Sequence, residues 1–203
     1  MSIHKLIAAG LLTACLVLAL PACTDKEEAP PPVDAETAEH VAACRAAMKK
    51  LGGALKARLE AAVQADGLVG ALEVCNVEAV PITKTISREE GLMVGRTSLR
   101  ARNPGNAPDD WERGILAEFA ARRVKGEDPA ALEAWAIRED ADGQRTFRYM
   151  KAIPTAALCL NCHGSELEPA VTAKIAALYP QDTATGYAEG DIRGAFTIVK
   201  PIE

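Results

Sequence analysis

Aromatic residues are scarce in this chain of 203 residues, which holds only three Phe, three Tyr and two Trp. Aromatic rings usually supply much of the apolar area of a core. A domain of this size with so few of them could therefore use another large apolar body to fill its interior. Histidine is rarer still, with three residues, and cysteine is limited to six.

The chain also lacks an excess of positive charge and a long hydrophobic run. Its formal net charge is −5, whereas nucleic-acid binding normally needs a basic face. We therefore expect no nucleic-acid partner. The one extended apolar run, from Leu6 to Leu20, is short for a membrane-spanning helix.

That run belongs to a segment typical of bacterial export. Lys5, the apolar run and small residues before Cys23 predict a signal peptide over residues 1–22. The sequence "LPAC" resembles a lipobox, in which Cys23 is lipidated and becomes the first mature residue. We thus expect anchoring on the periplasmic side of a bacterial membrane. The alternatives are cleavage elsewhere, giving a soluble secreted chain, or an uncleaved anchor.

A polar, Pro-rich segment follows and predicts a tether over residues 23–34. The folded domain is expected over residues 35–203. Its apolar periodicity predicts a helix from Glu36 to about Ala65, with a soft spot at Gly52 and Gly53, and a second helix from Leu68 to Ala79 that stops at Pro81. Residues 91–106 predict a strand that enters a long loop.

The second half of the domain predicts a sheet with helices inserted. Asp109 or Asp110 can cap a helix that ends at Gly126, with an apolar stripe made of Trp111, Ile115, Leu116, Phe119 and Val124. Residues 132–140 and 145–153 predict two strands joined by a tight Asp-Gly turn, with Phe147, Tyr149 and Ile153 on one side. A helix over Val171 to Leu178 and a final strand over residues 193–202 complete an α+β fold.

The stretch "CLNCHG", from Cys159 to Gly164, is the strongest chemical signal in the sequence. Random placement of the chain's Cys and His would produce a C-x-x-C-H string only about 0.003 times per chain. This spacing is typical of haem c, whose vinyl groups form thioethers with the two thiols while the adjacent imidazole binds the iron. Cys159 and Cys162 are then the predicted attachment points, and His163 is the predicted proximal ligand of one covalent haem.

Three other interpretations compete with haem. A zinc site would need Cys44 and Cys75 as additional ligands, because no second close pair is present. A thioredoxin-like dithiol would need a βαβ setting, which the predicted elements lack. A plain disulfide would leave His163 without a role. Haem also agrees with export and with the scarcity of aromatic rings.

The ligand opposite His163 stays open on these grounds alone. The mature chain offers His40, the thiols of Cys44 and Cys75, and the methionines Met48, Met93 and Met150. Each methionine has an ordinary interpretation as core filler. His40 is more simply an exposed helix residue, and a buried cysteine is often only a small apolar side chain.

Several stretches occur together in an order that resembles one family. They are "ALEVC", "VGRTSLRARNPGNAPDDWE", "FRYMKAI", "CLNCHG" and "YPQDTATGYAEGDIRGAF". The region from about Glu36 to Ile202 is similar to the PAS-like c-type haem domain family, usually catalogued as a domain of unknown function. The resemblance implies a PAS-like antiparallel sheet flanked by helices. It also implies a His/Cys axial pair, which falls on His163 and Cys75.

The basic stretch after residue 95 is a second candidate for haem contact. Strand alternation would place Arg96, Ser98, Arg100 and Arg102 on one face. Guanidinium groups bind carboxylates well, so Arg96 and Arg102 are candidate ligands of the haem propionates. The alternatives are that these arginines pair with Asp109, Asp110 or Glu112, or that they simply solvate the loop. Arg193 in "DIRGAF" invites the same comparison.

Two classes of function fit these expectations. The domain could transfer single electrons to an exported redox partner, or it could act as a redox or gas sensor that responds to nitric oxide or carbon monoxide through a signalling partner. A chain that ends at Glu203, directly after its last strand, favours the carrier. With two protein ligands on the iron and no evident acid/base pair, we do not expect an enzyme.

Overall fold

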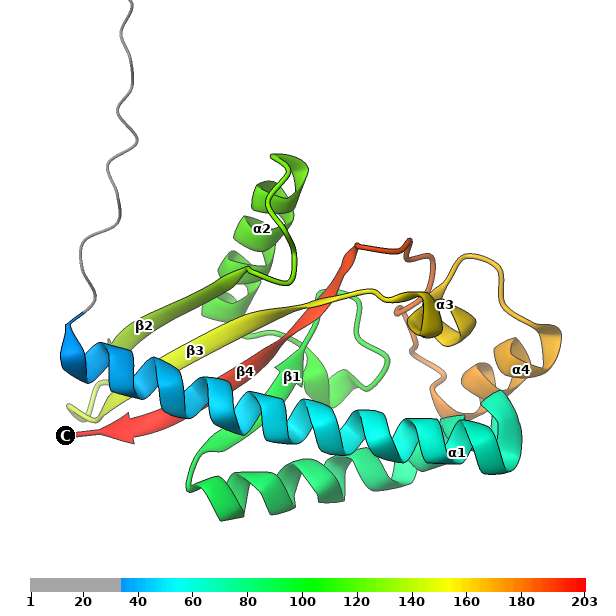
Figure 1. Cartoon of the computed structure of the whole chain (residues 1–203), viewed down its shortest axis with the longest axis horizontal. Helices are drawn as coiled ribbons and strands as arrows, with labels where there is room; N and C mark the ends of the chain where they lie inside the picture. The colour runs from blue at the N-terminus through cyan, green and yellow to red at the C-terminus, as the bar shows by residue number, and fades with distance from the viewer. Residues whose placement is uncertain (1–33) are drawn as a thin grey trace, which may run out of the picture. The chain divides into compact units, whose positions relative to one another are not determined.

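The computed structural model describes residues 34–203. The predicted signal peptide, Cys23 and nearly all of the tether lie outside the described residues. The elements follow in the order α1 (Ala35–Glu90), β1 (Met93–Thr97), η1 (Pro104–Asn106), α2 (Asp110–Val124), β2 (Glu133–Glu139), β3 (Arg145–Pro154), α3 (Ala157–His163), α4 (Pro169–Leu178) and β4 (Ile192–Ile202). Figure 1 shows their arrangement.

The four strands form one antiparallel sheet in the order β1-β4-β3-β2. β4 lies between β1 and β3, with Arg96 opposite Phe196 and Tyr149 opposite Ile198. β2 and β3 form the predicted hairpin, in which Trp135 faces Tyr149. Its turn covers residues 140–144 and is therefore longer than a two-residue Asp-Gly turn. The side chain of Asp140 holds this turn by accepting hydrogen bonds from the amides of Asp142 and Gln144. The α+β class with an antiparallel sheet and a long N-terminal helix is confirmed.

The helix α1 has two arms that run back alongside each other (Figure 1). Asp34 caps its start by accepting a 2.7 Å hydrogen bond from the amide of Thr37. The break falls at Gly67, whose φ of 68° and ψ of −172° suit only glycine. This break agrees with the predicted boundary between two helices, whereas Gly52 and Gly53 interrupt nothing.

The prediction that the second helix stops at Pro81 is wrong, because the second arm continues to Glu90. Proline removes one backbone hydrogen bond to the residue four positions earlier. That residue, Val77, is 67% exposed, so its carbonyl can bond to water instead. Beyond Pro81 the arm buries Ile86 against the sheet, which favours its continuation.

The sheet is covered on both faces. Phe147, Tyr149 and Ile198 pack against α1 together with Leu51, whereas Met150, Ala152 and Ala195 pack against Phe119 of α2. Phe147 and Tyr149 are fully buried, and burial of each such side chain stabilises the fold by about 2–3 kcal/mol. The predicted placement on one side is therefore confirmed for Phe147 and Tyr149, whereas Ile153 is not part of this cluster.

The capping of α2 also follows the prediction. Asp109 accepts a hydrogen bond from the amide of Glu112, and Glu112 accepts one from the amide of Asp109, which makes a capping box. Val124 does not belong to the buried stripe, because it is 83% exposed at the last position of the helix. Within residues 34–203, no helix combines the length and the apolar character needed to cross a membrane.

Candidate functional site

The C-x-x-C-H motif lies on α3, a short helix that directly follows β3. Residues three positions apart share a helix face, so Cys159 and Cys162 point to the same side. Cys162 packs against the small apolar cluster of Leu72, Val171 and Ile175. This cluster joins α3 to α4 and to the second arm of α1. The helix itself was not predicted, because seven residues are too few to show periodicity.

His163 ends this helix with one ring nitrogen engaged and the other available. Its Nδ1 lies 2.6 Å from the carbonyl oxygen of Ala184. A carbonyl only accepts, so Nδ1 carries the proton and Nε2 carries the lone pair. Burial lowers the pKa of His163 to about 3, and the positive charges of Arg193, Arg102 and Arg96 add to this effect. The result is a neutral imidazole with Nε2 free to bind a metal.

Cys75 lies on the second arm of α1, one turn after Leu72. Burial raises the pKa of its thiol, and the positive charges of Arg96, Arg102 and Arg193 oppose the rise. The same three arginines act on His163. Cys75 also contributes to the raised pKa of Cys162. The fold therefore brings Cys75 to the motif across 87 residues of sequence from Cys162.

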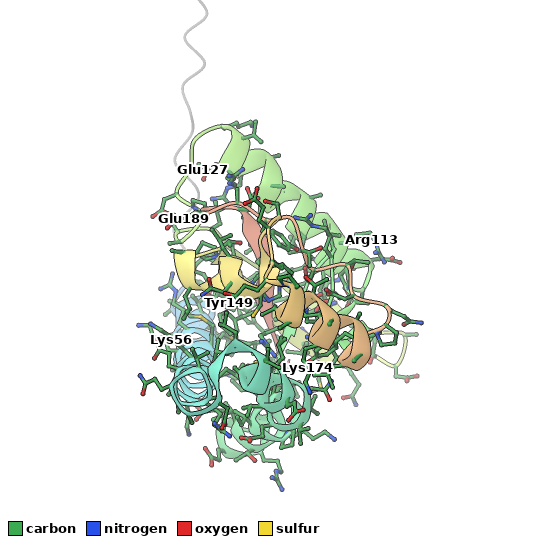
Figure 2. All side chains as sticks on the ribbon, turned by 90° about the vertical axis from the view of Figure 1, so that its right-hand side faces the viewer. Lys56, Arg113, Glu127, Tyr149, Lys174 and Glu189 are labelled. Carbon is green, nitrogen blue, oxygen red and sulfur yellow. The ribbon has the colours of Figure 1, made fainter. Side chains whose placement is uncertain are left out.

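The helix α4 covers the arm that carries Cys75. Lys174 of α4 forms an ion pair with Glu73, two residues before Cys75. Figure 2 looks at this end of the molecule, with α4 beside α1 and Lys174 labelled. The charges of both Cys75 and Arg102 act on the pKa of Tyr179, which comes directly after α4. The ion pair and the apolar cluster together hold Cys75 on the side of the molecule where α3 lies.

The other candidate ligands lie in other surroundings. Cys44 is fully buried between α1 and the sheet, and Met150 is buried on the opposite face of the sheet. The ring of His40 lies beside the ring of Phe147, with 5.1 Å between the ring centroids. Its Nδ1 lies 2.8 Å from the Nζ of Lys200. Of the two candidate thiols, Cys75 has a pKa on which the arginines near His163 act, whereas the nearby charge that acts on Cys44 is Lys200.

Two arginines of the site have no acidic partner. Burial and the nearby charge of Arg193 lower the pKa of Arg96. Arg193 has a buried Nε without a hydrogen-bond partner. Neither forms an ion pair with a carboxylate of residues 34–203. Both side chains are half-buried, and a cation that loses part of its hydration without gaining a partner is costly. This arrangement therefore indicates a place for an anion.

The predicted strand face of Arg96, Ser98, Arg100 and Arg102 is not formed, because β1 ends at Thr97. Ser98 ends the ladder by donating a 2.6 Å hydrogen bond from its hydroxyl to the carbonyl of Arg193. Arg100 instead stacks over the ring of Tyr187 at 3.7 Å. The alternative partners were wrong for Arg102, which pairs with Asp182, whereas Asp109 and Glu112 pair with Arg148.

The competing interpretations of the motif find little support in this geometry. Within residues 34–203 no three His, Cys, Asp or Glu side chains converge to hold a metal ion. Cys159 and Cys162 are free thiols, as are Cys44 and Cys75. The antiparallel sheet has no βαβ unit around the motif. Asp182, Ala184 and Arg193 complete the site, and only Arg193 could be suspected from sequence, as a guanidinium near a turn.

The fold and the site define a class: an α+β domain whose antiparallel sheet, helical hairpin and C-x-x-C-H helix bring a cysteine and a histidine to an arginine-lined centre. The chain belongs to the Tll0287-like family, whose model matches residues 26–201. This confirms the family resemblance inferred from the residue blocks.

Among solved structures, the chain is similar to one described as the cyanobacterial haem protein Tll0287. The two share 23% identity with a TM-score of 0.60, over 84% of this chain and 98% of the other. At this identity the similarity concerns the fold. No curated protein matches the chain.

Proposed function

We propose that this protein binds one covalent haem c and serves as an exported one-electron carrier. Cys159 and Cys162 form the thioethers, His163 is one axial ligand and Cys75, as thiolate, is the other. The observation that carries the proposal is the state of His163, whose Nδ1–H is held by the carbonyl of Ala184 while Nε2 stays free. A ligating histidine usually has this arrangement.

The residues of the site fit the group in charge as well. Haem propionates are carboxylates, and Arg96 and Arg193 are half-buried arginines that form no ion pair with a carboxylate of residues 34–203. A thiolate at Cys75 would supply a further negative charge among the same arginines. We therefore keep Arg96 as a propionate ligand and add Arg193 as a second. A propionate contact of Arg102 remains a prediction, and it would compete with the hydrogen bonds that Arg102 donates to Asp182.

The bound haem would supply an Fe(III)/Fe(II) couple for single-electron transfer. An anionic sulfur ligand favours the ferric state, so we expect a potential below that of His/Met proteins. Two protein ligands and the absence of an evident acid/base pair support a role as a carrier, not an enzyme. Its partner would be another exported redox protein, met at the periplasmic side of a bacterial membrane.

Sensing is the alternative, and one observation favours it. Burial raises the pKa of Cys75 in spite of the arginines near it. A sulfur that gains a proton is a poor ligand, so proton uptake at Sγ would open a position to carbon monoxide or nitric oxide. A signalling partner would then read the change.

The first test is a spectrum of the purified mature protein, oxidised and reduced, with and without carbon monoxide. A carrier should show the same reduced spectrum with the gas, whereas a sensor should show a new one. Acid–acetone extraction should leave the colour on the protein. Colour that moves entirely into the solvent would end the haem c proposal.

The second test concerns the ligand opposite His163. Electron paramagnetic resonance of the ferric protein should give a low-spin signal of the thiolate type that disappears in Cys75→Ser. Cys44→Ser is the matched control and should keep the signal, because Cys44 lies in the core between α1 and the sheet. An unchanged signal in Cys75→Ser would exclude this assignment.

A further inference from the structure

The segment from Asp182 to Tyr187 holds the end of α3 at three points. The carbonyl of Ala184 binds Nδ1 of His163 at 2.6 Å. The amide of Tyr187 donates to the carbonyl of His163, and the amide of Gly186 donates to the carbonyl of Gly164, each at 2.9 Å. Both the backbone and the ring of His163 therefore depend on the position of this segment.

One ion pair fixes the segment in turn. Asp182 accepts from the amide of Ala184 at 2.9 Å through Oδ1, and the same oxygen accepts from Nε of Arg102 at 3.1 Å. Nη2 of Arg102 donates to the carbonyl of Cys162 at 2.6 Å and to the carbonyl of Ala184 at 3.3 Å. One guanidinium thus joins the motif helix to the carbonyl that His163 binds.

This pair is shielded from water. The side chains of Arg102 and Asp182 are only 12% and 8% exposed, so salt and solvent screen their attraction less than on a surface. The planar fork of arginine makes several directed hydrogen bonds at once, which lysine cannot copy. Arg102 also shares the Ala184 oxygen with His163, and hydrogen bonding at Nδ1 sets how strongly an imidazole donates to a metal.

We propose that Arg102 and Asp182 are positioning residues, which set the orientation and donor strength of the His163 imidazole through the Ala184 carbonyl. This inference rests on the proposed haem function. It gives Arg102 a task other than the predicted propionate contact. Arg96 and Arg193, which lack acidic partners, are left to bind the propionates.

The test variant is Arg102→Gln with Asp182→Asn, which removes both charges and leaves no unpaired ion. The matched control is Arg148→Gln with Glu112→Gln. That pair is similarly buried, at 14% and 10% exposed, but joins β3 to α2. The test variant loses one buried ion pair, and the control loses at least as much, because Arg148 also pairs with Asp109. A change confined to the test variant therefore reports position and not loss of stability.

Two measurements are made on each mature protein. The first is the ferric low-spin signal in electron paramagnetic resonance. The test variant should shift or split its g values, because the ring gains freedom, and the control should match the parent protein. The second is amide hydrogen exchange, which should be about tenfold faster at Gly186 and Tyr187 in the test variant only, as expected for the loss of a charged hydrogen bond.

The outcomes separate the inference from the function on which it rests. A parent protein without covalent haem would overturn both. A parent protein with haem, whose signal is the same in the test variant or changes equally in the control, would overturn the positioning role alone. If the test variant fails to fold, Asp182→Asn replaces it and should give the same shift in smaller measure; no shift would again overturn the inference.

Discussion

At the residue scale, the site combines side chains that a motif reveals with side chains that only the fold brings together. Cys159, Cys162 and His163 are adjacent in sequence, so the motif alone predicted them. Cys75 followed only from the family resemblance, because the residues next to it in the sequence do not distinguish it from Cys44. The structure separates the two thiols by their environment: the charges of several arginines act on Cys75, whereas Cys44 lies in an apolar cluster.

Cys44 should behave as an inert core residue. It is fully buried, and burial raises the pKa of its thiol to about 11, only partly opposed by the charge of Lys200. The thiolate is the reactive form. We expect iodoacetamide at about pH 8 to leave Cys44 unmodified in the native protein, as read by mass spectrometry, and to modify it in guanidinium chloride. Rapid native labelling would contradict this burial.

Glu133 should make the stability of the domain depend on acid pH. Burial alone would raise its pKa, but hydrogen bonds from Arg45 and Tyr149 outweigh burial and hold the pKa below 4.5. A lowered pKa gives stability that is present above about pH 4.5 and lost as the pH falls through the folded-state value. Glu133→Gln should cost about 2 kcal/mol at pH 7.

The measurement is chemical denaturation of both proteins at about pH 7 and pH 3. The difference between parent and Glu133→Gln should shrink at the lower pH, because stability that comes from a lowered carboxyl pKa declines once the pH falls below the unfolded-state value. Glu139→Gln, on the same strand but exposed, is the control and should match the parent at both values. A difference that stays constant with pH would show that the charge of Glu133 is not what stabilises the fold.

At the element scale, the boundaries that a local signal marks were predictable and the others were not. The side chain of Asp109 caps the start of α2. Gly67 separates the two arms of α1, because its backbone conformation suits only glycine. Pro81 led to a wrong helix end. The free-energy cost of a proline inside a helix depends on whether the carbonyl four residues earlier, here that of Val77, reaches water. The end of β1 was equally hidden, because Ser98 bonds to Arg193, which is 95 residues away in the sequence.

The hairpin of α1 gives a paired test of glycine. Gly67→Ala should destabilise the domain by about 1–3 kcal/mol, because no other residue readily adopts its backbone conformation. Gly53→Ala should stabilise it by about 0.5–1 kcal/mol, since an added Cβ there meets no atom within 4 Å in a helical backbone. Denaturant unfolding measures both. Equal effects of the same sign would exclude a strained turn at Gly67.

At the scale of the whole molecule, the class was predictable because the order of elements and the alternation along β3 and β4 are visible in the sequence. The strand order was not, because the pairing of β1 with β4 joins segments about 100 residues apart. The scarcity of aromatic rings also has a structural counterpart. Phe147, Tyr149 and Phe119 are all fully buried, so three of the eight aromatic residues fill the two faces of the sheet.

Export and anchoring act on the molecule as a whole, and we expect Cys23 to determine where the domain is found. Cys23→Ser should release the mature domain from membranes or stop its processing, as followed by cell fractionation and by the mass of the chain. The lipid adds apolar area that holds a protein at a bilayer. A processed variant that still fractionates with membranes would show that another feature anchors it.

The central place of β4 between β1 and β3 has a consequence for biosynthesis. β4 is the last strand of this sheet in chain order, so an incomplete chain can form the α1 hairpin and the β2–β3 hairpin while the sheet still lacks the strand that unites them. A chain cut short before Ile192 would leave both neighbouring strands with open edges, which favour aggregation. All of β4 must therefore be present before the domain can close.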